Sequence, residues 1–154
     1  MPEAIATRPP GAQSFRIVGS MIAVALVVPP LMMLTLPVVA LIITGPFMYI
    51  DARGMPVEPA WTGYAAMYLD MAVISGIAGA LLARVQGILP SHALTAGLLT
   101  ALSCVLQHLG KEALRGYPPH GIGDVLPSTL IAIVSIVPPM AFFLARGARE
   151  RLKP

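Results

Sequence analysis

The chain has 154 residues, of which 56% are hydrophobic and only 11% are charged. A soluble domain carries about 25% charged residues, so this composition and a mean hydropathy of +0.80 exclude an ordinary soluble domain and predict an integral membrane protein. The formal net charge of +3 comes from basic residues at the chain ends and in loops. Membrane topology explains that distribution better than nucleic acid does, and no nucleic-acid partner is expected.

The first segment of the chain is predicted to be a mobile N-terminal tail, over residues 1–14. It contains prolines at positions 2, 9 and 10 and shows no apolar periodicity. A cleaved secretory signal is not expected, because the apolar core of a signal peptide is roughly 7–15 residues long. The uncharged run after Arg16 instead continues from Ile17 to Ile50.

Four segments meet the requirement of about 20 mostly apolar residues for a membrane-spanning helix. They cover roughly residues 17–44, 61–83, 93–109 and 125–145. The connections contain glycine, proline and charged residues, and they are too short to separate folding units. We therefore predict one all-α domain, an integral membrane four-helix bundle over residues 15–146, followed by a basic C-terminal tail over residues 147–154.

Prolines interrupt the first and fourth spans, where a helix should be continuous. They are Pro29, Pro30, Pro37, Pro138 and Pro139. A helical proline removes one amide donor and clashes with the carbonyl four residues earlier, so both spans are predicted to be kinked. Lipid cannot pair with the freed carbonyls; Thr35 and Ser135 are candidate local partners. The carbonyls that most need partners are those of Ala25, Leu26, Val134 and Ser135.

The two proline pairs lie in similar sequences. Residues 22–34 and 131–143 share five identities in thirteen positions, and the two spans are expected to run antiparallel. Such a weak inverted repeat, with proline-interrupted helices at matching positions, is typical of transport sites. The alternative is that the two segments acquired their kinks independently, by chance or for packing.

Asp70 is the only acidic residue clearly inside a predicted span. A carboxylate at membrane depth is costly and is a functional candidate by default; the alternative is a structural residue bonded to Tyr68 or to a freed carbonyl. The third span offers partners, because its polar residues recur at intervals of three and four and form one stripe. This stripe consists of Thr100, Ser103, Cys104, Gln107, His108 and Lys111. Asp70, Tyr68, Thr100, Cys104, Gln107 and His108 are the candidate transport or buried polar residues.

A second face of residues 61–83 carries small residues. It consists of Ala72, Gly76, Ala80 and Ala83. Small residues near four-residue spacing let two helices approach closely. We predict that this face packs against another helix of the bundle or against another protomer.

The sequence offers little support for a metal, a cofactor or a reaction. No metal or cofactor is expected, and a membrane-embedded enzyme or redox carrier is a third alternative. Cys104 is the single cysteine, and haem in such a bundle would normally need two facing histidines. A zinc or copper site formed by His108, His120 and Asp124 is an alternative with no established ligand spacing. The nine methionines include no exposed Met-x-x-Met cluster and are explained as packing residues. Phosphate-loop and hydrolase motifs are missing from the sequence, which argues against an enzyme.

The distribution of lysine and arginine predicts the orientation. Seven basic residues lie on the side that would hold both termini, and three lie on the other side. The positive-inside rule then predicts cytoplasmic termini and insertion in the plasma (inner) membrane.

Two functions of different classes account for these features. In the first, the chain is a small transport or permeation protein that couples to a proton or another cation through Asp70. It would work as a homo-oligomer in the lipid bilayer, because four short spans enclose little cavity. In the second, it is a non-catalytic accessory or assembly subunit of a larger membrane complex. Its small-residue face would then dock on other membrane subunits, and Asp70 would pair with a basic residue of another chain.

Overall fold

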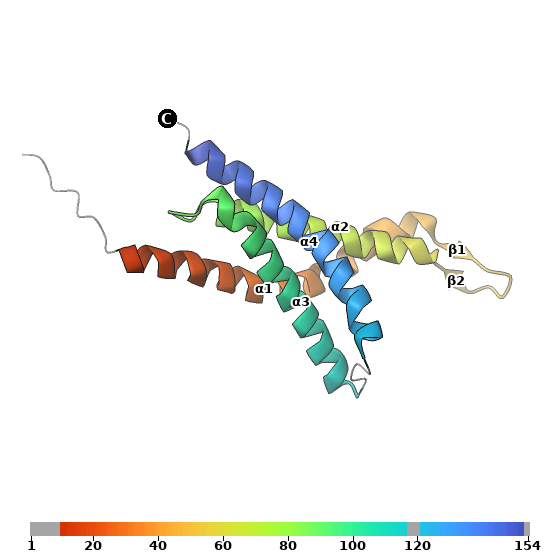
Figure 1. Cartoon of the computed structure of the whole chain (residues 1–154). Helices are drawn as coiled ribbons and strands as arrows, with labels where there is room; N and C mark the ends of the chain where they lie inside the picture. The colour runs from red at the N-terminus through yellow and green to blue at the C-terminus, as the bar shows by residue number, and fades with distance from the viewer. Residues whose placement is uncertain (1–9, 117–120, 153–154) are drawn as a thin grey trace, which may run out of the picture.

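The structure, a computed structural model, describes residues 10–116 and 121–152. Four long helices dominate it, and a two-stranded hairpin and two short 3-10 turns lie between them (Figure 1). The long helices are α1 (Pro10–Thr44), α2 (Ala60–Leu82), α3 (Ala93–Leu114) and α4 (Ile122–Arg151). Each is long and apolar enough to cross a membrane. The prediction of an all-α chain with four such helices is confirmed.

Three helices extend beyond the predicted spans. α1 begins at Pro10, inside the segment predicted as a tail, because proline at the first helical position has no amide bond to lose. α3 continues past residue 109 to Leu114 and stops before Gly116, whose φ of +86° favours glycine. α4 continues to Arg151, within the segment predicted as a C-terminal tail. Residues 1–9 and 153–154 lie outside the described residues, so the mobility expected for residues 1–14 stays a prediction.

A short hairpin joins α1 to α2. Its strands β1 (Tyr49–Ile50) and β2 (Pro56–Val57) are antiparallel, with Tyr49 opposite Val57. The carboxylate of Asp51 accepts hydrogen bonds from the amides of Arg53 and Met55, both at 2.9 Å, and Gly54 supplies the positive φ that the turn needs. The hairpin was not expected from the sequence, and it sets how α2 runs back along α1.

The four helices pack in the cyclic order α1, α2, α4, α3. Both termini and the α2–α3 loop lie at one end of the bundle, whereas the β1–β2 hairpin diverges from the facing ends of α3 and α4 at the other end (Figure 1). Contacts tie the first end together: Arg151 Nη1 donates to the carbonyl of Val85 at 3.1 Å, and the side chain of Gln13 lies against Gly87.

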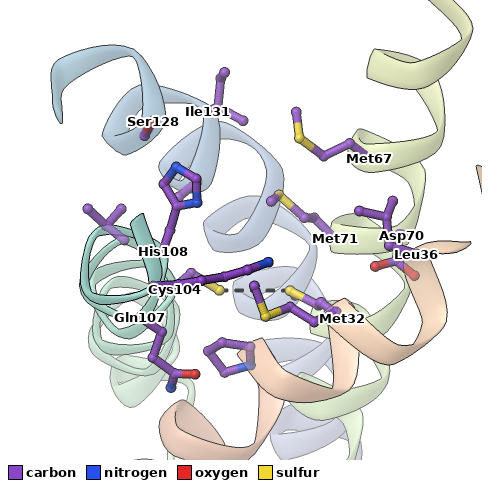
Figure 2. Close-up of a pocket in the computed structure, with 15 residues that line it drawn as sticks. Met32, Leu36, Met67, Asp70, Met71, Cys104, Gln107, His108, Ser128 and Ile131 are labelled. Carbon is purple, nitrogen blue, oxygen red and sulfur yellow. Dashed lines mark hydrogen bonds between the residues drawn. The ribbon is translucent and has the colours of Figure 1, made fainter. Parts of the chain in front are cut away.

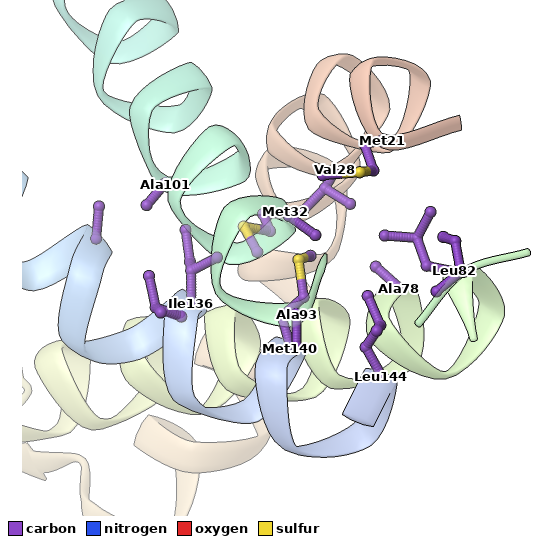
Figure 3. Packing of buried hydrophobic residues seen from close by; sticks show 14 of the residues in the cluster. Met21, Val28, Met32, Ala78, Leu82, Ala93, Ala101, Ile136, Met140 and Leu144 are labelled. Atoms are coloured by element: carbon purple, nitrogen blue, oxygen red, sulfur yellow. The ribbon is translucent and has the colours of Figure 1, made fainter. Parts of the chain in front are cut away.

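The hydrophobic core lies where α4 packs between α2 and α3. Ile136, Met140 and Leu144 of α4 are completely buried, and Met32 of α1 and Leu82 of α2 pack into the same cluster (Figure 3). By contrast, α1 leaves much of its apolar surface exposed.

Glycines bring α2 and α4 into close contact. A Cβ on Gly79 would overlap the carbonyl oxygen of Met140, and one on Gly76 would lie 3.1 Å from the ring of Phe143. Ala83 is also buried, against Gly147. This contact uses part of the predicted small-residue face inside the chain.

Two other residues of that face do not join this contact, since Ala80 is exposed in the single chain and Ala72 is half-buried. A strict four-residue spacing rotates by about 40° per step around a helix of 3.6 residues per turn. Gly79, three residues after Gly76, stays on the same face of α2 as Gly76. Gly79 therefore makes the contact with α4 that the strict four-residue spacing would have given to Ala80.

We expect Gly79→Ala to lower the free energy of unfolding by about 1–3 kcal/mol, the usual cost of overpacking. The added methyl group would meet the α4 backbone, which cannot move aside as a flexible side chain can. Gly63→Ala is the matched control, since it lies in the same helix with no atom within 4 Å of the new Cβ, and it should be neutral or mildly stabilising. Unfolding in mixed detergent micelles measures both, and equal effects would contradict the glycine contact.

Candidate functional site

A cavity of about 320 Å³ lies among the four helices. All four helices contribute to its wall (Figure 2). The wall is mostly apolar, and its polar side chains are Asp70 from α2, Cys104, Gln107, His108 and Lys111 from α3, and Ser128 from α4. A largely apolar cavity with a few convergent polar groups is the usual form of a small-ligand site.

Asp70 is the most deeply buried polar group of this cavity, with 2% of its surface exposed. Its Oδ1 lies 2.6 Å from Oγ1 of Thr35 on α1. The Thr35 hydroxyl also lies 3.1 Å from the carbonyl oxygen of Leu31. Because a hydroxyl has one proton to donate and can accept another, this arrangement satisfies either form of the carboxyl group. Ionised Asp70 accepts from Thr35, and protonated Asp70 donates to Thr35 while Thr35 donates to Leu31.

The pairing of Thr35 with Asp70 was missed by the sequence analysis, which assigned Thr35 to freed carbonyls and proposed Tyr68 as a neighbour of Asp70. Tyr68 is 40% exposed, whereas Asp70, two residues along the same helix, is buried. A signal for the correct pair exists in the sequence. Thr35 and Asp70 are equally far from the turn at Ala52 and Arg53, so an antiparallel α1–α2 pair brings them to the same depth.

The polar stripe of α3 divides between the cavity and the core. Cys104, Gln107 and His108 line the cavity with Asp70, as does Lys111. Thr100 instead lies in the core, where its hydroxyl donates to the Ala96 carbonyl at 2.9 Å and lies 3.4 Å from the sulfur of Met140. The stripe drifts around α3 with distance along the helix, so its first residue faces α4 and its later ones face the cavity.

The prolines of α1 and α4 lie inside continuous helices and leave carbonyls to be satisfied. Pro29 borders the cavity. The Leu26 carbonyl, which Pro30 deprives of its helical donor, lies 3.5 Å from Nε2 of Gln107. In α4, the Ser135 hydroxyl is buried, and within the described part of the chain it has no hydrogen-bond partner.

Sulfur-containing side chains form part of the cavity wall. Met32 and Met33 of α1 and Met67 and Met71 of α2 line it together with Cys104 (Figure 2). The Sγ of Cys104 lies 3.8 Å from the Sδ of Met32. The described residues contain no group of three His, Cys, Asp or Glu side chains that could hold a metal ion. The alternative of a loop metal site includes His120, which lies outside the described residues.

Comparisons with known protein families, with curated proteins and with solved structures find no match to this chain. The buried carboxyl group can hold or release a proton without losing its hydrogen bond, and the α3 residues add amide, imidazole and thiol groups within the same space.

We expect Thr35→Val to lower the free energy of unfolding by about 1–3 kcal/mol, because it leaves the buried Asp70 carboxyl without its partner. The same change in an Asp70→Leu background should cost much less. Thr129→Val is the control, since its hydroxyl bonds only the Val125 carbonyl of its own helix, at 2.8 Å. Unfolding of the four proteins of this cycle in mixed micelles gives the coupling, and a coupling near zero would rule out the Thr35–Asp70 bond.

Proposed function

We propose that this chain is a small membrane transport or permeation protein in which Asp70 binds or carries a proton or another cation. The observation that carries the proposal is the burial of Asp70 on a cavity that also holds Gln107 and His108. An ionisable group at membrane depth is costly and is found where ions or protons pass. A purely structural carboxyl group would need neither a cavity nor the other polar side chains.

The hydrogen bonds around Asp70 suggest how a proton could be exchanged. When Asp70 is ionised it accepts from Thr35, and when it is protonated the Thr35 hydroxyl turns to the Leu31 carbonyl, 3.1 Å away. Protonation of Asp70 therefore keeps the hydrogen bond between α2 and α1. It also directs the Thr35 hydroxyl proton to the Leu31 carbonyl of the α1 backbone. Pro37 lies two residues beyond Thr35, so the affected turn of α1 already lacks one backbone bond.

Insertion in the bilayer and kinking at the prolines are part of the proposal. α1 has 35 residues, or about 52 Å at 1.5 Å per residue, against a hydrocarbon core of about 30 Å. Tilting, a kink near Pro29 and Pro30, or extension beyond the membrane would accommodate the excess. We place both termini in the cytoplasm of a cell whose plasma (inner) membrane holds the protein. Arg16, Arg84 and Arg149 belong to the chain segments that gather at that end of the bundle.

This orientation predicts that reporter domains fused at either terminus are cytoplasmic, and that a cysteine introduced at Arg53 is labelled from the opposite side. The physical reason is the excess of basic residues at the end that holds both termini. Labelling of an Arg53→Cys, Cys104→Ser protein with an impermeant maleimide in intact cells measures it. Cytoplasmic location of residue 53 would reverse the topology.

We also propose a homo-oligomer. The exposed side of α1 carries large apolar residues, among them Leu34 (75% exposed) and Leu41 (70%), which lipid or a second copy would cover.

The alternative is that the chain is an accessory subunit of a larger membrane complex, but two arguments for this hypothesis are weakened. Gly76 and Ala83 pack within the chain rather than on a free docking surface, and Asp70 has a partner in Thr35. Purification in mild detergent tests it, since that hypothesis predicts a stoichiometric partner chain.

We expect Asp70→Asn to abolish cation-coupled proton movement in reconstituted vesicles while leaving the protein folded. The side-chain amide has a similar shape and can still form a hydrogen bond with Thr35. Unlike a carboxyl group, it does not take up or release a proton. A trapped pH dye, with imposed proton, sodium or potassium gradients, reports the flux. Thr129→Val serves as the control because its hydroxyl bonds the Val125 carbonyl of its own helix and Thr129 is not one of the cavity-lining residues, so it should behave as the unaltered chain. An Asp70→Asn protein with unchanged flux, or an unaltered chain no more permeable than empty vesicles, contradicts the proposal.

A further inference from the structure

We propose that the cavity binds a soft monovalent metal cation, Cu(I), for which Ag(I) is a surrogate, through Cys104, Met32 and His108. Thiolate and thioether sulfurs are the ligands that select Cu(I), while carboxylate and water suit harder ions. The sequence analysis set the methionines aside as packing residues, because it found no cluster in an exposed loop. The structure brings sulfur atoms from three helices to one cavity instead.

The spacing of two sulfur atoms supports shared coordination. Cys104 Sγ and Met32 Sδ are 3.8 Å apart. Two sulfurs that each lie about 2.3 Å from one ion, the distance typical of Zn–S bonds, are about 3.8 Å apart at a tetrahedral angle. The observed pair therefore needs little movement to hold one ion between its members.

We assign His108 as the third ligand, which requires its imidazole to turn from the position in Figure 2, where it points toward Ser128 and away from the Cys104–Met32 pair. His108 lies four residues after Cys104 on α3, and both side chains line the cavity (Figure 2). Side chains at i and i+4 lie on one face of a helix, which is how helical zinc motifs present two ligands to one ion. Met71, on the facing helix α2, lines the same space with a further thioether.

The charge balance favours a monovalent ion. Binding to Cys104 requires the thiolate, so the thiol proton moves to another group as the ion arrives, and the charge of the cavity rises by the one charge of a monovalent ion instead of by two. The Asp70 carboxylate in the same cavity is available to accept that proton. Lys111 lines the same cavity, so its ammonium group opposes any bound cation, and a monovalent ion meets half the repulsion that a divalent ion would meet.

Copper binding does not depend on transport, but the identification of Cu(I) as the transported ion rests on the proposed function. Under that proposal, one Cu(I) entering the cavity displaces one proton from Cys104 to Asp70. Release of that proton from Asp70 out of the cavity is the further step that would couple copper movement to proton movement.

Titration of the detergent-purified chain with the Cu(I)–bicinchoninate complex, under reducing conditions, tests the binding site. We expect one Cu(I) per chain, displaced by Ag(I) and unaffected by excess Zn²⁺. Cys104→Ser and Met32→Leu should each weaken binding by about 10–100-fold or more. Met48→Leu, a methionine outside the cavity, should leave binding unchanged. Met32→Leu keeps an apolar side chain of similar size, so it decides the question if Cys104→Ser does not fold.

Two results would overturn the metal assignment. One is an unaltered chain that takes up no Cu(I), and the other is Met32→Leu with undiminished affinity, which would indicate a simple thiol adduct. Vesicle assays distinguish failure of the metal site from failure of the proposed transport function. Proton flux that depends on Asp70 without Cu(I) binding rejects the metal site alone. Stoichiometric binding in a chain that conducts nothing supports the site and rejects transport.

Discussion

The hydrogen bond between Thr35 and Asp70 constrains the rest of the bundle. A carboxyl group in an apolar interior is costly without a partner, and the 2.6 Å contact supplies one across α1 and α2. It also fixes the rotation of α2. Gly79 lies nine residues after Asp70, about half a turn around the helix at 3.6 residues per turn. When Asp70 faces α1, Gly79 must face the opposite way, and there it meets the α4 backbone at Met140. One polar contact and one close packing contact thus define the two faces of α2.

The cavity follows from this arrangement. Close packing of α4 against α2 occurs around Gly76 and Gly79, in the half of α2 nearer the termini, and Gly97 of α3 meets Val137 of α4 in the same way. Beyond these contacts the β1–β2 end diverges from the facing ends of α3 and α4 (Figure 1). Longer side chains, chiefly methionines, fill that wider part incompletely, and the polar residues of α3 project into it. Tight packing in one half and an open site in the other are consequences of the same glycine distribution.

Local patterns in the sequence were enough to identify the four helices, and they singled out Asp70, Cys104, Gln107 and His108, which line one cavity in the structure. Hydrophobic length and helical spacing are properties of one segment, and they do not depend on how segments meet. The partner of Asp70 and the convergence of methionines from α1 and α2 do depend on it, as does the choice of Gly79 over Ala80. Each of these required the register between helices, which the hairpin around Gly54 sets through a turn only a few residues long. Hydrophobicity, which dominates the sequence, carries almost no information on that register.

The two proline pairs occupy different environments despite their similar sequences. Pro29 borders the cavity, and the carbonyl freed by Pro30 lies 3.5 Å from the amide of Gln107. Pro139 instead lies at the packed contact with α2, 3.9 Å from where a Cβ of Gly76 would be. In a functional inverted repeat, both pairs would flank one site and their carbonyls would face it. Pro29 lines the cavity, whereas Pro138 and Pro139 are not among its lining residues, so the two proline pairs are placed differently relative to the cavity. Any motion coupled to Asp70 is then expected in α1, which carries Thr35, Pro37 and the cavity-lining proline, while α4 stays fixed against the glycines of α2.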